Sequence, residues 1–438
     1  MNDRSPYVFM TTDYGASWKS IISDLPGGDF SYAACIAEDP IRQGLLYLGV
    51  ENGIFVSFDG GAHWAPLQQN LPHTRVSWIT VQRRFDDLVV ATYGRGIWIL
   101  DDVAPLQQLT AAVRSSSAHL FTIRPAYRFL TKPTLPIYMG EPNDPPSLAG
   151  QNPPYGADIS YYLGSVPSGD VQIQILDAGG HVIRALKGKK EQGINRVWWD
   201  LKYEESKSPL LRTKPLGAPQ VTLGPDGSRP FPSEGKLSPV VAPGDYTVKL
   251  KVGAAEFSQR LAVLKDPNSP GTQQDILAQT KMELGLRDAA NTMASVIDQA
   301  ETARSQIISL EPALKADARW KSLASDAEAL DTKLLALEEA FFDPHISSGN
   351  SFYYPARLYS KIMSLAVVVS SSDDFGPNQV GDDSAPTPAE NELYAMYTKQ
   401  IADEKSKFDE LVSTDLANFN AKLKSANVPH VTVAAPEN

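Results

Sequence analysis

The stretch Thr11-Thr12-Asp13-Tyr14-Gly15-Ala16-Ser17-Trp18 has a counterpart 46 residues later, Ser57-Phe58-Asp59-Gly60-Gly61-Ala62-His63-Trp64. Both follow the pattern S/T-x-D-x-G-x-x-W. A hydroxyl and a carboxylate at this spacing can accept hydrogen bonds from backbone N–H groups, while the glycine supplies a positive φ. We expect each tryptophan to fold back over its turn and bury its ring. Two copies at this period predict a repeat architecture. The motif residues are Thr11, Asp13, Gly15 and Trp18 in one copy and Ser57, Asp59, Gly61 and Trp64 in the other.

The sequence around the motif repeats as well. Residues 45–57 align with residues 87–99, and each stretch reads as a strand, a tight turn that contains glycine, and a second strand. After the later copy, Leu100-Asp101-Asp102 stands in place of the motif, and Val103-Ala104-Pro105 breaks the pattern. The repeats are therefore expected to end near residue 105.

This pattern resembles the Asp-box, or BNR repeat, and residues 1–105 resemble the last blades of bacterial sortilin-like and "glycosyl hydrolase" BNR-propeller proteins. The stretch that matches best is Ala91-Thr92-Tyr93-Gly94-Arg95-Gly96-Ile97-Trp98, followed by Asp101-Asp102. The resemblance implies a partial β-propeller of about two blades, whereas a closed propeller has about four to eight. Because Met1 falls inside a blade, we interpret the chain as the C-terminal part of a longer protein. The alternative is that a separate chain supplies the missing blades.

Composition and charge narrow the class of protein. Of the 438 residues, 42% are hydrophobic and 21% are charged, as in a folded globular protein. The net charge of −11 argues against binding nucleic acid or anionic membrane through a general basic surface. The chain has no apolar run of about 18 residues, which predicts no membrane span, and no signal peptide is visible in it. The family resemblance nevertheless implies an extracytoplasmic location, either periplasmic, cell-surface or secreted. Cys35, the one cysteine, excludes an internal disulfide and reads as a buried strand residue.

Residues 106–165 are rich in Pro, Gly, Ser and Tyr and read as an irregular connector. From 166 to 265, apolar and polar residues alternate as in β-strands. The expected strands are 170–177, 182–186, 193–200 and 243–250, with a Pro- and Gly-rich insertion at 202–241. Their sequences resemble the small Ig-like β-sandwich of flagellar hook-capping proteins. Alternation places Trp198 and Trp199 on opposite faces of one strand, so we expect one in the core and the other half exposed. A sugar-binding platform is the alternative for this pair.

After a linker at 266–271, the period of the apolar residues changes to about 3.5. Thr272 and Asp275 predict a capping box, and Pro312 is expected to begin a second helix. Four amphipathic helices in 272–428 predict an antiparallel four-helix bundle with a solvated outer face of charged residues, and 429–438 is expected to be a disordered tail. A polar loop rich in Asp and Pro precedes the fourth helix. The expected packing seams are Leu286, Ala289, Met293, Val296, Ala300, Ala303, Ile307 and Leu310; Trp320, Leu323, Ala327, Leu330, Leu334, Leu337 and Phe341; Leu358, Ile362, Leu365 and Val369; and Tyr397, Ile401, Phe408, Leu411, Phe419 and Leu423.

The sequence contains no recognisable catalytic motif. The six histidines are scattered without H-E-x-x-H or a Glu-x-x-His pair, and neither G-x-S-x-G nor a phosphate-binding loop occurs. We therefore predict no catalytic residue, no cofactor and no metal in this chain. In Asp-box propellers the motif lies opposite the ligand face, so the turns at 51–53 and 93–96 should face a ligand. The candidate ligand rim is Glu51, Asn52, Arg75, Trp78, Tyr93 and Arg95. Alternatively, Tyr93 and Arg95 only close their turn.

Two functions remain open. The first is a non-enzymatic extracytoplasmic binding or scaffold protein of the sortilin-like type, with a protein, peptide or glycan ligand. The second is a BNR-repeat glycoside hydrolase, similar to sialidases or xyloglucanases. Because glycoside hydrolysis needs two carboxylates across one pocket, its catalytic residues would lie mostly in the missing N-terminal blades.

Overall fold

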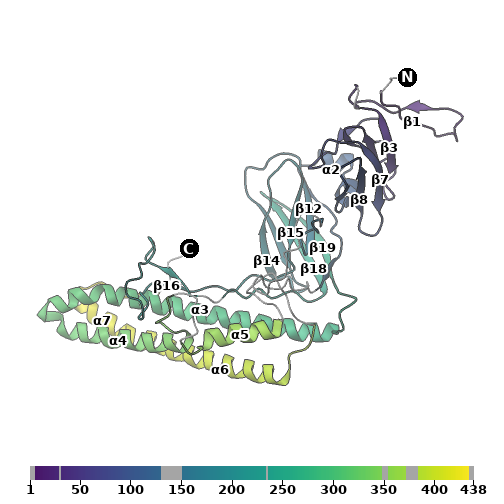
Figure 1. The fold of residues 1–438 in the computed structure, drawn as a ribbon. Helices are drawn as coiled ribbons and strands as arrows, with labels where there is room; N and C mark the ends of the chain where they lie inside the picture. Colours follow the sequence, from purple (N-terminus) through teal and green to yellow (C-terminus); the bar gives the residue numbers. More distant parts are fainter. Residues whose placement is uncertain are drawn as a thin grey trace. The chain divides into compact units, whose positions relative to one another are not determined.

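The computed structural model of the chain describes residues 5–28, 31–129, 150–232, 235–347, 354–370 and 383–433. It is a mixed β and α structure with several sheets and long helices (Figure 1). Part of the predicted connector, part of the polar loop before the last predicted helix, and residues 434–438 of the predicted tail lie outside the described residues. The chain divides into two compact units: Met1–Arg124, Gly150–Asp200 and Thr247–Leu261 form the first, and Pro125–Ala149, Leu201–Tyr246 and Ala262–Asn438 form the second.

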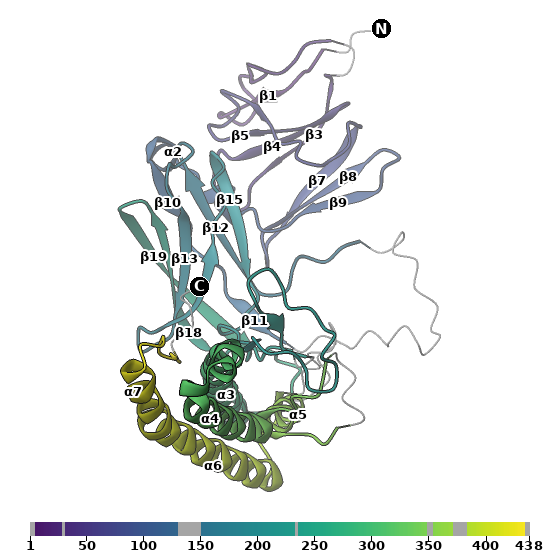
Figure 2. The same cartoon turned by 90° about the vertical axis from the view of Figure 1, so that its left-hand side faces the viewer.

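Three antiparallel sheets open the first unit (Figure 2). The first sheet pairs β1 (Phe9–Met10) with β2 (Lys19–Ser20). The second sheet has the order β3 (Ala33–Glu38), β4 (Leu46–Val50), β5 (Gly53–Ser57) and β6 (Ala65–Pro66). The third sheet has the order β7 (Val76–Gln82), β8 (Asp87–Thr92) and β9 (Ile97–Leu100). The predicted strand–turn–strand stretches are the hairpins β4–β5 and β8–β9.

Apolar side chains fill the space between successive sheets. Strand β4 is buried along its whole length, and its residues alternate between two clusters. Leu48 packs with Trp64 and residues of the first sheet, whereas Tyr47 packs with Val56 and with Val90 of the third sheet. The second sheet is therefore covered on both faces, which explains why its central strands are mostly apolar.

Two further sheets follow the short helices α1 (Ala104–Gln108) and α2 (Ala111–Ser115). One has the order β10 (Ala118–Leu120), β12 (Ala157–Leu163) and β15 (Gly193–Trp199). The other has the order β11 (Ala126–Arg128), β19 (Ala255–Lys265), β18 (Gly244–Val252), β13 (Val171–Leu176) and β14 (Val182–Lys187). As predicted, β15 buries Trp199 completely and leaves Trp198 half-buried.

The long helices belong to the second unit. They are α3 (Gln273–Ala316), a 3-10 turn (Ala318–Trp320), α4 (Lys321–Phe341), α5 (Leu358–Ser370), α6 (Pro388–Leu411), a π turn (Val412–Leu416) and α7 (Ala417–Ser425). Thr272 and Asp275 form the predicted capping box. The predicted seams are buried in one apolar cluster, with Leu310, Trp320 and Tyr397 at its edge. Two short strands, β16 (Leu210–Leu211) and β17 (Arg229–Pro230), pair within the predicted insertion. No helix in the described ranges is long and apolar enough to cross a membrane.

Pro312 does not begin a helix, contrary to the prediction, because α3 continues through it to Ala316. A proline in this place removes the N–H that would bond to the carbonyl of Ile308. Both Pro312 and Ile308 are exposed, so water can replace the missing donor. The next helix, α4, begins only after the 3-10 turn.

Candidate functional site

The first Asp-box motif forms the turn between β1 and β2. The Thr11 hydroxyl oxygen accepts the N–H of Gly15 at 2.8 Å, and Asp13 Oδ1 accepts the N–H of Ser17 at 2.8 Å. Gly15 has a φ of 92°, which glycine adopts without strain. Hydrogen bonds from the side chain and backbone of Ser17 lower the pKa of Asp13 to about 2. The carboxylate therefore serves as a fixed acceptor inside its own turn.

The second motif forms the turn between β5 and β6 with the same bonds. Ser57 Oγ accepts the N–H of Gly61 at 2.9 Å, and Asp59 Oδ1 accepts the N–H of His63 at 2.9 Å. His63 Nδ1 lies 2.7 Å from Asp59 Oδ2, in the place of the Ser17 hydroxyl of the first motif. Burial raises the pKa of Asp59, but the bonds from His63 and Ser57 outweigh it and lower the pKa overall. The two motifs make the same hydrogen bonds although several of their residues differ. This indicates that the shared motif residues stabilise the turn and have a structural role.

The two tryptophans differ. Trp64 is buried, and its indole N–H donates to the carbonyl of Ile21 at 2.7 Å, so it joins the second sheet to the segment after β2. Trp18 is 62% exposed, contrary to the expectation that its ring is buried. The ring does lie against its own turn, with Cζ2 3.9 Å from the position that a Cβ would take at Gly15. Burial of this ring needs a neighbouring sheet, which Trp64 has and Trp18 lacks within the described residues.

The candidate ligand rim lies at the other end of β5 from the second Asp-box, because Glu51 and Asn52 occupy the β4–β5 turn. Arg75 Nε lies 3.8 Å from Glu51 Oε2, and the Arg75 guanidinium stands 5.4 Å from the centre of the Tyr32 ring. Neither of the two paired atoms makes a hydrogen bond within the described residues, although both are shielded from solvent. The N–H of Tyr93 donates to the Arg75 carbonyl at 2.8 Å. The structure thus brings four of the predicted rim residues together.

Three residues that the sequence prediction did not include contact the candidate rim. The carbonyl of Tyr32 accepts the N–H of Glu51 at 3.2 Å, and Nδ1 of His73 lies 3.3 Å from the carbonyl of Asn52. The Thr74 hydroxyl donates to the carbonyl of Tyr93 at 2.9 Å. His73 and Thr74 directly precede Arg75, so their place in the sequence was a usable signal, whereas the position of Tyr32 depends on the β3–β4 pairing.

The remaining two predicted rim residues, Trp78 and Arg95, are both exposed. The Arg95 carbonyl accepts the indole N–H of Trp98 at 2.9 Å, which fits the alternative that Arg95 closes its turn. Trp78 stands on β7, directly opposite Ala91. Because Tyr93 follows Ala91 by two residues, its side chain leaves the sheet on the same side as Trp78. The rim therefore continues onto one face of the third sheet.

That face of the third sheet is mostly apolar and largely exposed. Trp78, Ala91 and Ile97 form one cross-strand row, and Thr80, Val89 and Ile99 form the next. Trp78 is 68% and Ile97 is 71% exposed. In the second sheet, Ile54 and Val56 take the hairpin positions of Ile97 and Ile99, and both are buried in the cluster shared with the third sheet. The exposed face is thus the face that a following sheet covers in the preceding repeat.

A second polar cluster in the first unit lies where the repeats end. Arg196 on β15 pairs through Nε with Asp158 Oδ2 at 2.9 Å. Its two terminal nitrogens donate to the carbonyls of Asp101 and Asp102, both at 2.9 Å. Burial raises the pKa of Asp158 to about 6, although the Arg196 charge opposes this rise. The cluster holds the end of the repeats to strands β12 and β15.

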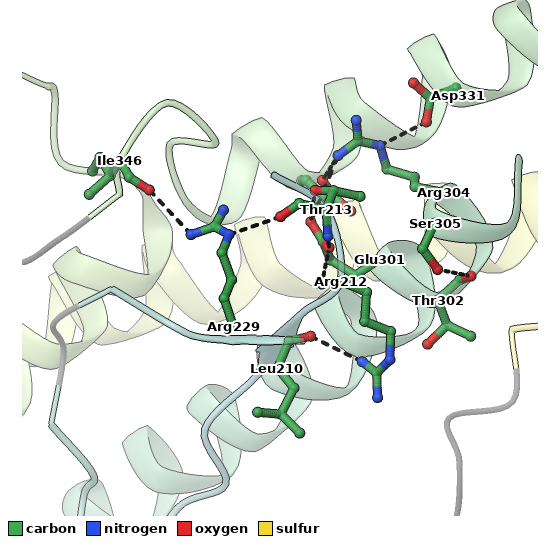
Figure 3. A network of polar contacts seen from close by, with 11 residues as sticks. Leu210, Arg212, Thr213, Arg229, Glu301, Thr302, Arg304, Ser305, Asp331 and Ile346 are labelled. Atoms are coloured by element: carbon green, nitrogen blue, oxygen red, sulfur yellow. Dashed lines mark hydrogen bonds and ion pairs between the residues drawn. The ribbon is translucent and has the colours of Figure 1, made fainter. Parts of the chain in front are cut away.

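The second unit contains a buried network of charges (Figure 3). Glu301 accepts the backbone N–H groups of Arg212 and Thr213 at 2.5 and 2.6 Å. Arg304 donates through Nε to Asp331 at 2.9 Å and through Nη1 to Glu338 at 2.6 Å. These bonds tie the segment around β16 to α3 and α4.

Glu301, Arg304 and Glu338 are all buried, which corrects the expectation that the charged residues of the helices form a solvated outer face. The insertion around β16 covers this side of α3, and its backbone donors replace water. Burial, and next the neighbouring Glu301 charge, raise the pKa of Glu338 well above its usual range. The network therefore has a structural role, because its bonds connect the β16 segment, α3 and α4. No group of three or more His, Cys, Asp or Glu side chains among the described residues could hold a metal ion.

Comparisons of the chain with protein-family models, with curated proteins and with solved structures find no match.

Proposed function

We propose that this chain is a non-enzymatic, extracytoplasmic binding or scaffold protein. In this proposal the first three sheets are blades of an Asp-box β-propeller, the next two sheets form an Ig-like sandwich, and α3 to α7 form an antiparallel four-helix bundle. Support comes from the equal geometry of the two Asp-box turns and from the way each of the three sheets packs on the next.

The exposed apolar face of the third sheet is the observation that carries the proposal. Single exposed apolar residues need no explanation, but two adjacent cross-strand rows form a continuous patch. Ile54 and Val56 occupy the equivalent positions in the second sheet, where the third sheet covers them. A β-sheet is therefore the kind of structure that packs on such a face. We infer that further sheets, in the same polypeptide or in a separate one, stack against Trp78, Ile97 and Ile99.

The rim supplies the ligand-binding chemistry. Arg75 offers a cation whose partner, Glu51, lies beyond hydrogen-bond distance and which stands over the Tyr32 ring. The exposed Tyr93 is bonded to Arg75 through the backbone. A cation next to aromatic faces suits a peptide with a carboxylate or a glycan. Of the residues named for this rim, Glu51 is the one carboxylate, whereas glycoside hydrolysis needs a pair at a defined separation. The rim therefore favours binding over hydrolysis.

Arrays of glycans and peptides, probed with the chain and its variants, test the proposal. Tyr93→Ala and Arg75→Ala should each lower the affinity for a captured ligand by about tenfold or more, as substitutions at binding hot spots do. Tyr14→Ala is the matched control, because Tyr14 is a fully exposed tyrosine on an Asp-box turn. Release of reducing sugar from a glycan, abolished by Glu51→Gln, would instead establish a hydrolase.

A further inference from the structure

The segment Val428–Val433, called here the strap, leaves the end of α7 and runs onto α3. Asn427, with a φ of 58°, ends the helical path, and the N–H of Val428 bonds back to the carbonyl of Leu423 at 2.9 Å. A residue with positive φ at this place is the usual way for a chain to leave a helix. The strap therefore begins at a sharp, local hinge.

Two side-chain amides hold the strap by its backbone. Asn420 on α7 donates from Nδ2 to the carbonyl of Val431 at 2.8 Å and accepts the N–H of Val431 at 2.8 Å. Gln306 on α3 donates to the carbonyl of Thr432 at 2.8 Å and accepts its N–H at 3.1 Å. In an extended chain, consecutive residues turn their N–H and C=O groups to opposite sides. Each amide thus forms the pair of backbone hydrogen bonds that a neighbouring β-strand would form with the strap.

One side chain anchors the strap. Val431 is buried in the helical core, while Val428 and Val433 lie partly buried against it. Pro429 and His430 are exposed. Two surface hollows that are open to solvent, of about 740 Å³ and 710 Å³, both reach Pro429 and His430; Gln306 helps to line the first and Asn420 the second. Backbone recognition, one apolar pocket and open space alongside are the features of a site for an extended peptide.

We propose that Asn420, Gln306 and the Val431 pocket form a peptide-binding site, and that the strap is its built-in ligand. The outside occupant is an extended segment of a partner protein with a β-branched apolar residue in the place of Val431. The amides specify an extended backbone and accept any side chain there, whereas the pocket selects the anchor. This site is independent of the rim in the first unit.

The strap competes with such a partner. The contacts that hold it include four hydrogen bonds of two amides and one buried side chain, Val431, so the strap can open without unfolding the helices. Because it is tethered through a short hinge, its effective concentration is on the order of millimolar. An outside peptide therefore binds weakly to the intact chain and more strongly when the strap is released.

The test uses the labelled peptide Val-Pro-His-Val-Thr-Val and fluorescence anisotropy. A chain that stops after Asn427 should bind it saturably, and the full chain should bind it at least about tenfold more weakly. Full-length Val431→Asp, which expels the strap and keeps the site, should also gain binding, and it answers the question if the shortened chain fails to fold. A peptide with Asp as its fourth residue should not bind.

Variants of the shortened chain locate the site. Asn420→Leu and Gln306→Leu each remove two hydrogen bonds to the peptide and should weaken peptide binding by about tenfold. Gln299→Leu is the matched control, since Gln299 is an amide on α3 whose side chain donates to Ser295 of the same helix. The proposal is wrong if the folded, strap-free variants do not bind the peptide, or if the amide variants bind it unchanged. Concentration-dependent dimers of the full chain that vanish in Val431→Asp would assign the site to a second copy and overturn the partner assignment.

Discussion

Replacement of Trp64 by alanine removes the side chain that joins the first two sheets. The ring is buried, and truncation of a buried tryptophan destabilises a protein by about 3–5 kcal/mol. The Ile21 carbonyl also loses the indole N–H that bonds to it at 2.7 Å, which adds about 1 kcal/mol when the acceptor stays buried. We therefore expect Trp64→Ala to lower the free energy of unfolding of the sheets by about 4–6 kcal/mol.

The repeat supplies the matched control. Trp18 holds the same motif position but is mostly exposed, so Trp18→Ala should lower the free energy of unfolding by less than about 1 kcal/mol. Hydrogen exchange of the β4 and β5 amides is the assay, because it reports on this part of the chain and does not depend on tryptophan fluorescence. If the two variants raise exchange equally, the reasoning from packing between the sheets is refuted.

Three more predictions concern charge and exposure. Asp158, with a pKa of about 6 in the folded chain and an ordinary value of 3.8, binds a proton more tightly when folded, so stability should fall by roughly 2 kcal/mol as the pH rises from 4 to 6. Urea unfolding across this range should show a smaller fall in Asp158→Asn, and equal pH profiles would contradict the assignment. Arg304→Met leaves Glu338 and its neighbours without their cation, so we expect a loss of about 3–5 kcal/mol in thermal or urea unfolding that acid partly restores; a loss below 1 kcal/mol would contradict it. Ile97→Lys should change the free energy of unfolding by less than about 0.5 kcal/mol and reduce binding of the dye ANS, because Ile97 is exposed; clear destabilisation would show that its face is covered.

The helices could be predicted where the signal is local. The spacing of apolar residues identifies α3, α4, α5 and the α6–α7 run, and a Thr-x-x-Asp pattern marks the start of α3. The prediction that Pro312 begins a helix was wrong because a proline in a helical sequence can either occupy the first turn of a new helix or lie within the last turns of an existing one. A proline is tolerated inside the helix when the carbonyl that it leaves unbonded, here that of Ile308, can bond to water. That exposure depends on how the helix packs and cannot be deduced from the local sequence.

The buried charges could not be predicted from the helix alone. Glu301 and Arg304 interrupt no apolar seam, and a charged residue beside a seam normally faces solvent. Here a segment almost 90 residues earlier in the chain lies over α3 and donates its backbone N–H groups to Glu301. The cover belongs to the predicted insertion, whose Pro- and Gly-rich composition gave no sign of a packing role.

Burial of a strand depends on its neighbours as much as on its own sequence. The hairpins β4–β5 and β8–β9 share one apolar pattern, and that pattern correctly located both. Yet Ile54 is buried and Ile97, at the same place in its hairpin, is exposed. The difference lies in the third sheet, which covers Ile54 and has no counterpart over Ile97 within the described residues. Because the candidate rim continues onto this same face through Trp78 and Tyr93, a sheet that covered Ile97 would also lie beside that rim. If the rim binds a ligand as proposed, occupation of the face and ligand binding should therefore rise and fall together.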